Sequence, residues 1–125
     1  MIFGIGTDIV AIARMSDLWQ RHGERALERL LAVSERDDCR CATDPGRFLA
    51  KRFAAKEALG KALGTGIRAP AQLNAIAISH DAHGKPCFDL APELAAHLSS
   101  QGLTAHVSIS DEREYAVAFV VIERQ

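Results

Sequence analysis

Two carboxylates and a lysine are the residues of this 125-residue chain whose types and spacing point most directly to chemistry. Asp8 follows a run of branched residues and glycines, "IFGIGTDIV", and Glu57 and Lys61 stand four residues apart in "RFLAKRFAAKEALGKALGTGI". Two carboxylates from separate segments suit a hard cation such as Mg²⁺, which keeps several waters and shares phosphate oxygens with its substrate. Lys61, one helical turn beyond Glu57, would place a positive charge beside that phosphate. These residues therefore predict a site for magnesium and phosphate.

Each of these residues also has a structural interpretation, and the residues alone leave both open. Asp8 suits a helix N-cap or a turn, and Glu57 with Lys61 has the favourable order of a helical ion pair. The projected helix nevertheless has no single polar face. On one side lie Phe48, Ala55, Leu59, Ala62 and Leu63, and opposite lie Ala50, Phe53 and Ala54. Glu57 and Lys61 fall between them, where a buried carboxylate is costly unless something neutralises it.

The first half of the chain is expected to form a strand followed by helices. "IFGIGTDIV" predicts a buried strand, and residues 11–42 are helix-rich with a break at Gly23. Ser34, with an aspartate three residues later, resembles the N-cap of another short helix. A long helix is expected from Pro45 to about Leu63, where "GTG" ends it, because glycine adopts the left-handed conformation without penalty.

The second half of the chain changes to alternating apolar and polar residues. Hairpins are expected around "DAHGKP" and around the turn at Asp111 to Glu114, with a helix from Pro92 to Gln101 between them. No repeat or linker divides the chain, so residues 1–125 are predicted to be one domain. The expected class is α+β, in the order β-α-α-α-β-β-α-β-β, with helices packed on a mostly antiparallel sheet.

Composition excludes several classes of protein. The net charge of −1 argues against bulk nucleic-acid binding, and no apolar run approaches the length of a membrane span. The N-terminus has no basic start and meets Asp8 early, unlike a signal peptide. The three cysteines, Cys39, Cys41 and Cys87, lack the spacing of a zinc site and are expected to be free thiols. We therefore expect a cytoplasmic protein with no nucleic-acid or membrane partner.

Four stretches of the sequence resemble one known family over essentially the whole chain. They are "GIGTDIVAIAR", "FLAKRFAAKEALGKALGTGI", "GKP" and "HVSISDEREYAVAFVV", and the most specific part is the K-E-A-x-x-K-A-x-G-T-G run from Lys56 to Gly66. Together they resemble holo-acyl-carrier-protein synthase, the small bacterial phosphopantetheinyl transferase. The resemblance implies the 4′-phosphopantetheinyl transferase fold and transfer of 4′-phosphopantetheine from coenzyme A to a serine of apo acyl carrier protein. Adenosine 3′,5′-bisphosphate is then the other product, and the reaction supports fatty acid biosynthesis.

The resemblance also implies roles for particular residues. Asp8 and Glu57 match the family's magnesium ligands, and Lys61 matches the lysine that contacts the transferred phosphate. The implied coenzyme A-binding residues are Arg52, Lys61, Gly64, Gly66, Pro86 and His106, with backbone N–H groups of "GTGI" also available to a phosphate. The family's active sites lie between the subunits of a homotrimer. Docking of an acidic carrier protein is implied for Arg14 and Arg21 and, less directly, for Arg25, which form one stripe if the helix continues through Gly23.

The chain departs from its relatives at two positions. Val10 stands where larger relatives have a third metal-binding carboxylate, and Asp111 stands where many members have histidine, so no histidine base is available there. The base that deprotonates the acceptor serine is either a water held by the metal or a nearby carboxylate. Two other functions remain open: a magnesium-dependent hydrolase of nucleotides or pyrophosphate with water as acceptor, and a non-catalytic oligomeric module in which Glu57 and Lys61 are a buried pair.

Overall fold

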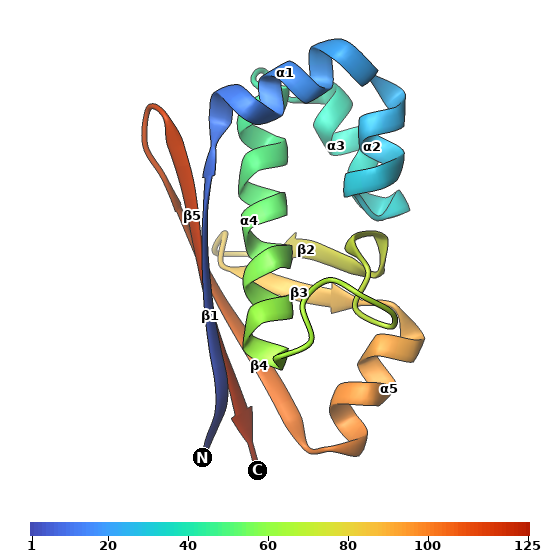
Figure 1. The fold of residues 1–125 in the computed structure, drawn as a ribbon, viewed down its shortest axis with the longest axis vertical. Helices are drawn as coiled ribbons and strands as arrows, with labels where there is room; N and C mark the ends of the chain where they lie inside the picture. The colour runs from blue at the N-terminus through green and yellow to red at the C-terminus, as the bar shows by residue number, and fades with distance from the viewer.

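Helix α4 (Pro45–Leu63) runs through the middle of the molecule, and the other elements pack around it (Figure 1). The structure, a computed structural model, describes residues 1–125. A sheet of β1, β5 and β4 lies along one side of α4. Helices α1 to α3 lie beside the N-terminal half of α4 on the side away from this sheet, and the β2–β3 hairpin and α5 lie towards its C-terminal half.

The elements follow one another in an order consistent with the predicted one, with one additional short helix before α4. They are β1 (Ile2–Ala11), α1 (Ile12–His22), α2 (Glu24–Leu30), η1 (Val33–Glu35), α3 (Arg36–Cys41), α4, η2 (Leu73–Ala75), β2 (Ile76–His80), β3 (Pro86–Leu90), α5 (Pro92–Ser100), β4 (Leu103–Asp111) and β5 (Tyr115–Arg124). All strand pairs are antiparallel, as predicted, but they form two sheets, β1-β5-β4 and β2-β3. None of the helices has the length and apolarity needed to cross a bilayer.

The three-stranded sheet turns one face towards α4 and the other away from it. The inward residues of β5, Ala116, Ala118, Val120 and Ile122, are fully buried. Asp8 pairs with Ala118 in the antiparallel register, so it lies on the α4 face of the sheet. The strand therefore presents Asp8 to the helix that carries Glu57 and Lys61.

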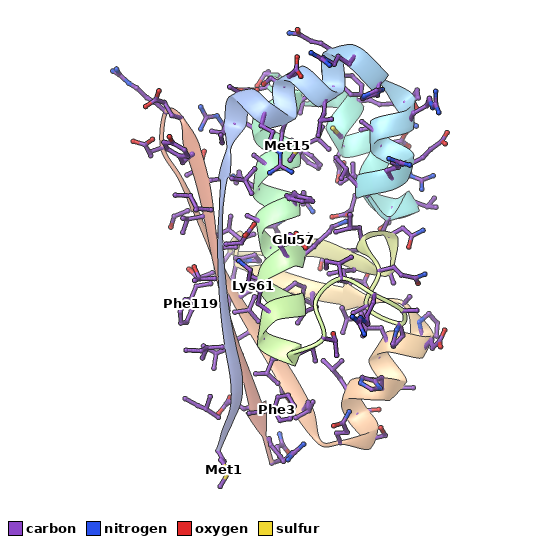
Figure 2. All side chains as sticks on the ribbon, viewed as in Figure 1. Met1, Phe3, Met15, Glu57, Lys61 and Phe119 are labelled. Carbon is purple, nitrogen blue, oxygen red and sulfur yellow. The ribbon has the colours of Figure 1, made fainter.

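Strand β1 is less buried than its apolar sequence predicts. Ile2, Ile5 and Ile9 are 65%, 59% and 63% exposed on the outer face of the sheet. Phe119 on β5 is also exposed, and its side chain points away from α4 (Figure 2). The prediction of a buried strand is therefore wrong for this face, because the single layer of helices covers only the other one.

Glycines in β1 allow the strand to lie directly against α4. A Cβ built on Gly6 would stand 2.0 Å from the carbonyl oxygen of Ala58, and one on Gly4 would stand 2.1 Å from that of Ala62. Neither distance is possible for a real side chain, so the close approach requires glycine at both positions. This contact sets the separation between Asp8 and the residues of α4.

The ends of α4 are those that the sequence predicts. Pro45 occupies the first turn, and the Asp44 carboxylate accepts a hydrogen bond from the Arg47 N–H. At the other end Gly64 adopts the left-handed conformation with φ of 83°.

The helices before α4 differ from the prediction in one detail. Gly23 does separate α1 from α2, but Ser34 is not an N-cap and lies inside η1. The Glu35 carboxylate instead accepts the Ala32 N–H at 3.0 Å, which closes the turn without the serine.

Candidate active site

Lys61 connects α4 to β1 at the centre of the predicted site. Its Nζ donates to the Thr7 carbonyl oxygen and to Asp8 Oδ1, both at 3.0 Å, and Figure 2 shows it beside the strand. The alternative interpretation, an ion pair between Glu57 and Lys61, is not what the structure shows, because Lys61 reaches across to Asp8 instead. The structure thus brings Asp8, Glu57 and Lys61 to one junction between strand and helix.

Glu57 has no cation of its own in this junction. Burial raises the pKa of the Glu57 carboxyl, and the negative charge of Asp8 raises it further, while Lys61 and Arg14 act in the opposite direction. Glu57 remains partly exposed. The charged form of Glu57 is therefore less favourable here than in water, and a cation between the two carboxylates would reverse that penalty.

The donors at the junction fit a hard cation. Asp8 and Glu57 offer carboxylate oxygens, with no histidine or cysteine among them, and no cluster of three metal-binding side chains occurs in the chain. Val10, on the same face of β1 as Asp8, is 2% exposed and packs in the core. A site with two protein carboxylates suits Mg²⁺, which takes its remaining ligands from water and phosphate.

The loop after α4 contributes fewer backbone donors than the sequence suggests. The Gly64 N–H donates to the carbonyl oxygens of Gly60 and Lys61, and the Gly66 N–H donates to Gly60 at 3.0 Å. Both amides therefore cap the helix and are not free to bind a phosphate, which corrects the expectation for these two amides of "GTGI". Gly64 and Gly66 themselves are exposed beside the C-terminal end of α4.

Arg52 is more buried than a ligand-binding arginine usually is. It is 8% exposed, and its Nη1 donates to Glu35 Oε2 at 3.1 Å and to the Ile78 carbonyl oxygen. Its guanidinium lies 4.4 Å from the centre of the Phe48 ring. Arg52 also lines a groove of about 270 Å³ with Phe48, Lys51 and His80, so it combines a structural contact with access to a cavity.

Pro86 and His106 lie apart from the junction. Pro86 begins β3 and pairs with His80. His106 pairs with Val121 on the outer face of the sheet, and its Nε2 lies 2.7 Å from Glu123 Oε1. The sheet therefore separates His106 from Asp8, Glu57 and Lys61 of the same chain.

The three arginines expected to dock a carrier protein do not share one continuous helix. Arg14 and Arg21 are on α1, whereas Arg25 is on α2, because Gly23 breaks the helix with φ of 52°. Arg14 lies 5.5 Å from the centre of the Phe53 ring, and Arg21 pairs with Asp17 at 3.1 Å. Arg25 lines a groove of about 450 Å³ between the two helices.

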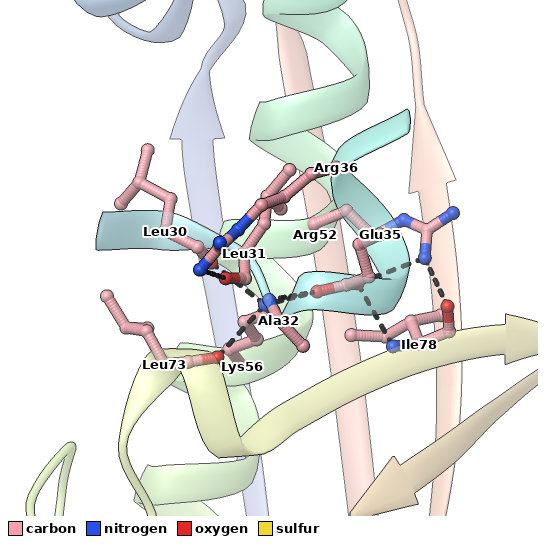
Figure 3. A network of polar contacts seen from close by, with 9 residues as sticks. All are labelled: Leu30, Leu31, Ala32, Glu35, Arg36, Arg52, Lys56, Leu73 and Ile78. Carbon is pink, nitrogen blue, oxygen red and sulfur yellow. Dashed lines mark hydrogen bonds and ion pairs between the residues drawn. The ribbon is translucent and has the colours of Figure 1, made fainter. Parts of the chain in front are cut away.

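Two charged residues that the sequence did not single out lie in the interior of the protein, on another side of α4. Glu35 is 2% exposed and Lys56 is fully buried, and Lys56 Nζ lies 2.6 Å from Glu35 Oε1 (Figure 3). Lys56 directly precedes Glu57, and its place in a helix with no single polar face was the one available signal.

Comparison with known proteins gives the class. The family model of the 4′-phosphopantetheinyl transferase superfamily matches residues 4–120. A crystal structure from Neisseria meningitidis, described as a holo-[acyl-carrier-protein] synthase, has a TM-score of 0.94 and 46% identity, with 99% of this chain and 100% of that chain covered. The fold is that of a phosphopantetheinyl transferase, an enzyme.

Curated relatives narrow the class to a family. Holo-[acyl-carrier-protein] synthases of Dechloromonas aromatica and Azoarcus sp. are 59% and 58% identical to the chain, each over 98% of both sequences. The Bacillus anthracis synthase, solved in complex with coenzyme A (3′,5′-ADP), has a TM-score of 0.83 and 35% identity, covering 100% of this chain and 99% of that one. The chain belongs to the holo-[acyl-carrier-protein] synthase family.

Proposed function

We propose that the protein transfers 4′-phosphopantetheine from coenzyme A to a serine of apo acyl carrier protein. The observation that carries this proposal is the junction of Asp8, Glu57 and Lys61, formed by β1 and α4 in a chain of this family. The name of the relatives gives the carrier protein as acceptor, and coenzyme A is bound in the Bacillus anthracis relative.

The reaction moves one phosphoryl-linked group between two oxygens. The serine hydroxyl oxygen forms a bond to the phosphorus that carries pantetheine, and the pyrophosphate bond to adenosine 3′,5′-bisphosphate breaks. The serine proton passes to a base, and the leaving phosphate takes the electron pair. Lys61, held by Thr7 and Asp8, would place a positive charge beside the pyrophosphate, and such positioning supplies much of the acceleration in phosphoryl transfer.

The charges at the junction support the proposed magnesium dependence. Asp8 and Glu57 would hold Mg²⁺, which, when bound, offsets the negative charge on the pyrophosphate oxygens. Two carboxylates with one lysine between them leave a net negative site, which would otherwise repel coenzyme A. Removal of the metal by a chelator is therefore expected to abolish transfer.

The outer face of the sheet supports a homotrimer with sites between subunits. Ile5, Ile9, Val117 and Phe119 leave an apolar surface on β1 and β5, and such surfaces usually mark protein–protein contacts. His106 lies on this same face, away from its own Asp8. If His106 binds coenzyme A, it does so from a neighbouring subunit.

Further residues would contact the two substrates. Coenzyme A would lie beside Arg52, Gly64, Gly66 and Pro86, and Arg52 would reach it through the groove that Arg52 lines. Arg14, Arg21 and Arg25 would attract an acidic carrier protein. The protein would act in the cytoplasm and support fatty acid biosynthesis, because holo carrier proteins carry growing acyl chains there.

The decisive experiment measures the intact mass of an apo acyl carrier protein after incubation with this protein, coenzyme A and Mg²⁺. A gain of one phosphopantetheine that EDTA prevents supports the proposal. The matched control is Lys61→Met, which should show little gain under the same conditions. No gain with several carrier proteins and a folded enzyme would contradict it, and release of phosphate without a protein acceptor would indicate the hydrolase instead.

A further inference from the structure

A buried cluster of three charged side chains lies on the side of α4 away from β1. We call Glu35, Arg52 and Lys56 the Glu35 cluster (Figure 3). Lys56 Nζ lies 2.6 Å from Glu35 Oε1, and Arg52 Nη1 lies 3.1 Å from Glu35 Oε2. One carboxylate therefore holds two cations that are one helical turn apart on α4.

The Glu35 carboxylate is fully bonded. Besides the two cations, its oxygens accept the backbone N–H of Ala32 at 3.0 Å and that of Ile78 at 3.1 Å. Glu35 thus connects the turn before α3, helix α4 and strand β2. A buried carboxylate needs such bonding to remain charged.

Lys56 adds two further connections to the Glu35 cluster. Its ammonium donates to the carbonyl oxygen of Leu30 at 2.8 Å and to that of Leu73 at 3.0 Å. All three of its donors are therefore used, each by a different segment of the chain. This arrangement fixes both the rotation of α4 about its axis and its position along that axis.

The rotation that buries Lys56 also determines where the functional residues point. Glu57 follows Lys56 by one residue and Lys61 by five, so they lie about 100° and about 140° around the helix from it, on one adjacent stripe. With Lys56 held among its three acceptors, this stripe faces β1, where Lys61 reaches Asp8 at 3.0 Å. The glycines of β1 set the distance between strand and helix, and the Glu35 cluster sets the rotation.

We propose that Glu35 is a positioning residue for the transfer reaction, acting through Lys56 and Arg52 on the orientation of Glu57 and Lys61. This inference rests on the proposed function, since it concerns the geometry of that reaction. A buried ionic cluster often adds little net stability compared with apolar packing. Its directional bonds instead specify one orientation of the helix.

The test compares Glu35→Gln with Glu24→Gln, a matched control in the helices before α4. Glu24→Gln removes an exposed carboxylate that pairs with Arg40 of α3, at 2.6 Å, and with no cation of α4. Urea unfolding gives the folded fraction of each variant, and turnover is measured where each is folded. Glu35→Gln should lower kcat by about 10- to 100-fold, and Glu24→Gln should leave it unchanged.

A double-mutant cycle separates positioning from general destabilisation. If Glu35 acts by orienting Lys61, Glu35→Gln should lower kcat by less than about threefold in a Lys61→Met background. The same fold-reduction in both backgrounds, or full turnover of folded Glu35→Gln, would overturn the inference. A parent enzyme that transfers nothing would instead contradict the proposed function.

If Glu35→Gln does not fold, the pair Glu35→Met and Lys56→Met replaces it, because this pair removes the carboxylate together with the fully buried ammonium and leaves Arg52 its bond to the Ile78 carbonyl oxygen. Low kcat in the folded double variant, with its dependence on Lys61, supports positioning. Full kcat in that variant would overturn the inference.

Discussion

Replacing Gly6 by alanine tests whether the contact between β1 and α4 sets the geometry of the site. A Cβ on Gly6 would lie 2.0 Å from the Ala58 carbonyl oxygen and 2.7 Å from the Ala62 nitrogen. Ordinary contact begins at 3.4 Å, so strand and helix would have to separate by roughly 1.4 Å. Both neighbours are backbone atoms, which cannot rotate away as the end of a side chain can. The strain must therefore displace α4 relative to β1.

The size of the effect follows from that displacement. Overpacking of a well-packed core costs about 1–3 kcal/mol, and we expect the upper end because the obstacle is backbone. A loss of about 3 kcal/mol would lower Tm by roughly 10 °C. Turnover should fall by about 100-fold, because Lys61 moves with α4 while Asp8 stays on β1, and errors near 1 Å are that costly.

The assay is urea unfolding followed by circular dichroism at one protein concentration, together with turnover of the folded enzyme. Gly102→Ala is the control, since its φ is 66° but the added Cβ would make only an ordinary contact, 3.9 Å from the Gln125 carbonyl oxygen. The free energy of unfolding of Gly102→Ala should fall by about 1 kcal/mol through backbone strain, and its turnover should equal that of the parent. A Gly6→Ala variant with the turnover of the parent and a free energy of unfolding within about 0.5 kcal/mol of it would show that this contact does not set the geometry of the site.

Three further predictions concern charges. Glu57→Gln should lower turnover by at least about 100-fold, yet unfold at pH 7 with a free energy equal to or above the parent's. Burial and Asp8 raise the pKa of Glu57, so its stabilising contribution is present below the unfolded pKa and lost as pH rises through the folded pKa; a clear loss of stability at pH 7 would contradict this. Reversing Arg14 and Arg21 to glutamate should raise KM for an acidic carrier protein about tenfold and weaken its salt dependence, and unchanged carrier kinetics would count against docking there. Burial lowers the pKa of Lys56 to about 8 from 10.5, so the unfolding free energy of the parent should rise relative to Lys56→Met between those pH values. The expected rise is on the order of 3 kcal/mol, and parallel pH curves would contradict it.

The sequence alone predicted where α4 begins and ends, because proline and glycine mark its ends. It also predicted which residues of α4 lie close together on the helix surface, because that depends only on their spacing. Pro45 and Gly64 mark the ends of α4, and the i, i+4 spacing placed Glu57 and Lys61 on one stripe. Their partners could not be predicted in the same way. Lys61 has a carboxylate four residues away, but the structure pairs it with Asp8, 53 residues distant in the chain. Only the packing of β1 against α4 decides between them.

Burial was harder to predict than secondary structure. The apolar residues of β1 occur on both faces of the strand, so no alternation showed that Ile5 and Ile9 would be exposed. The burial of Lys56 was not predicted, because its partner Glu35 is 21 residues away and belongs to another element. In both cases the local sequence does not show which other elements cover a residue.

Helix α4 carries five cations and a single anion, and this imbalance explains its lack of a polar face. Each cation has a carboxylate partner from another part of the chain; the pairs are Arg47–Asp111, Lys51–Asp111, Arg52–Glu35, Lys56–Glu35 and Lys61–Asp8. Glu57 alone lacks an ionic partner, and its pKa is raised rather than lowered. Because other elements cover α4 on nearly all sides, a charged carboxylate without a partner there costs free energy of folding. A cation between Glu57 and Asp8 would offset that cost, so the one unpaired charge of α4 supports the proposed metal site at this position.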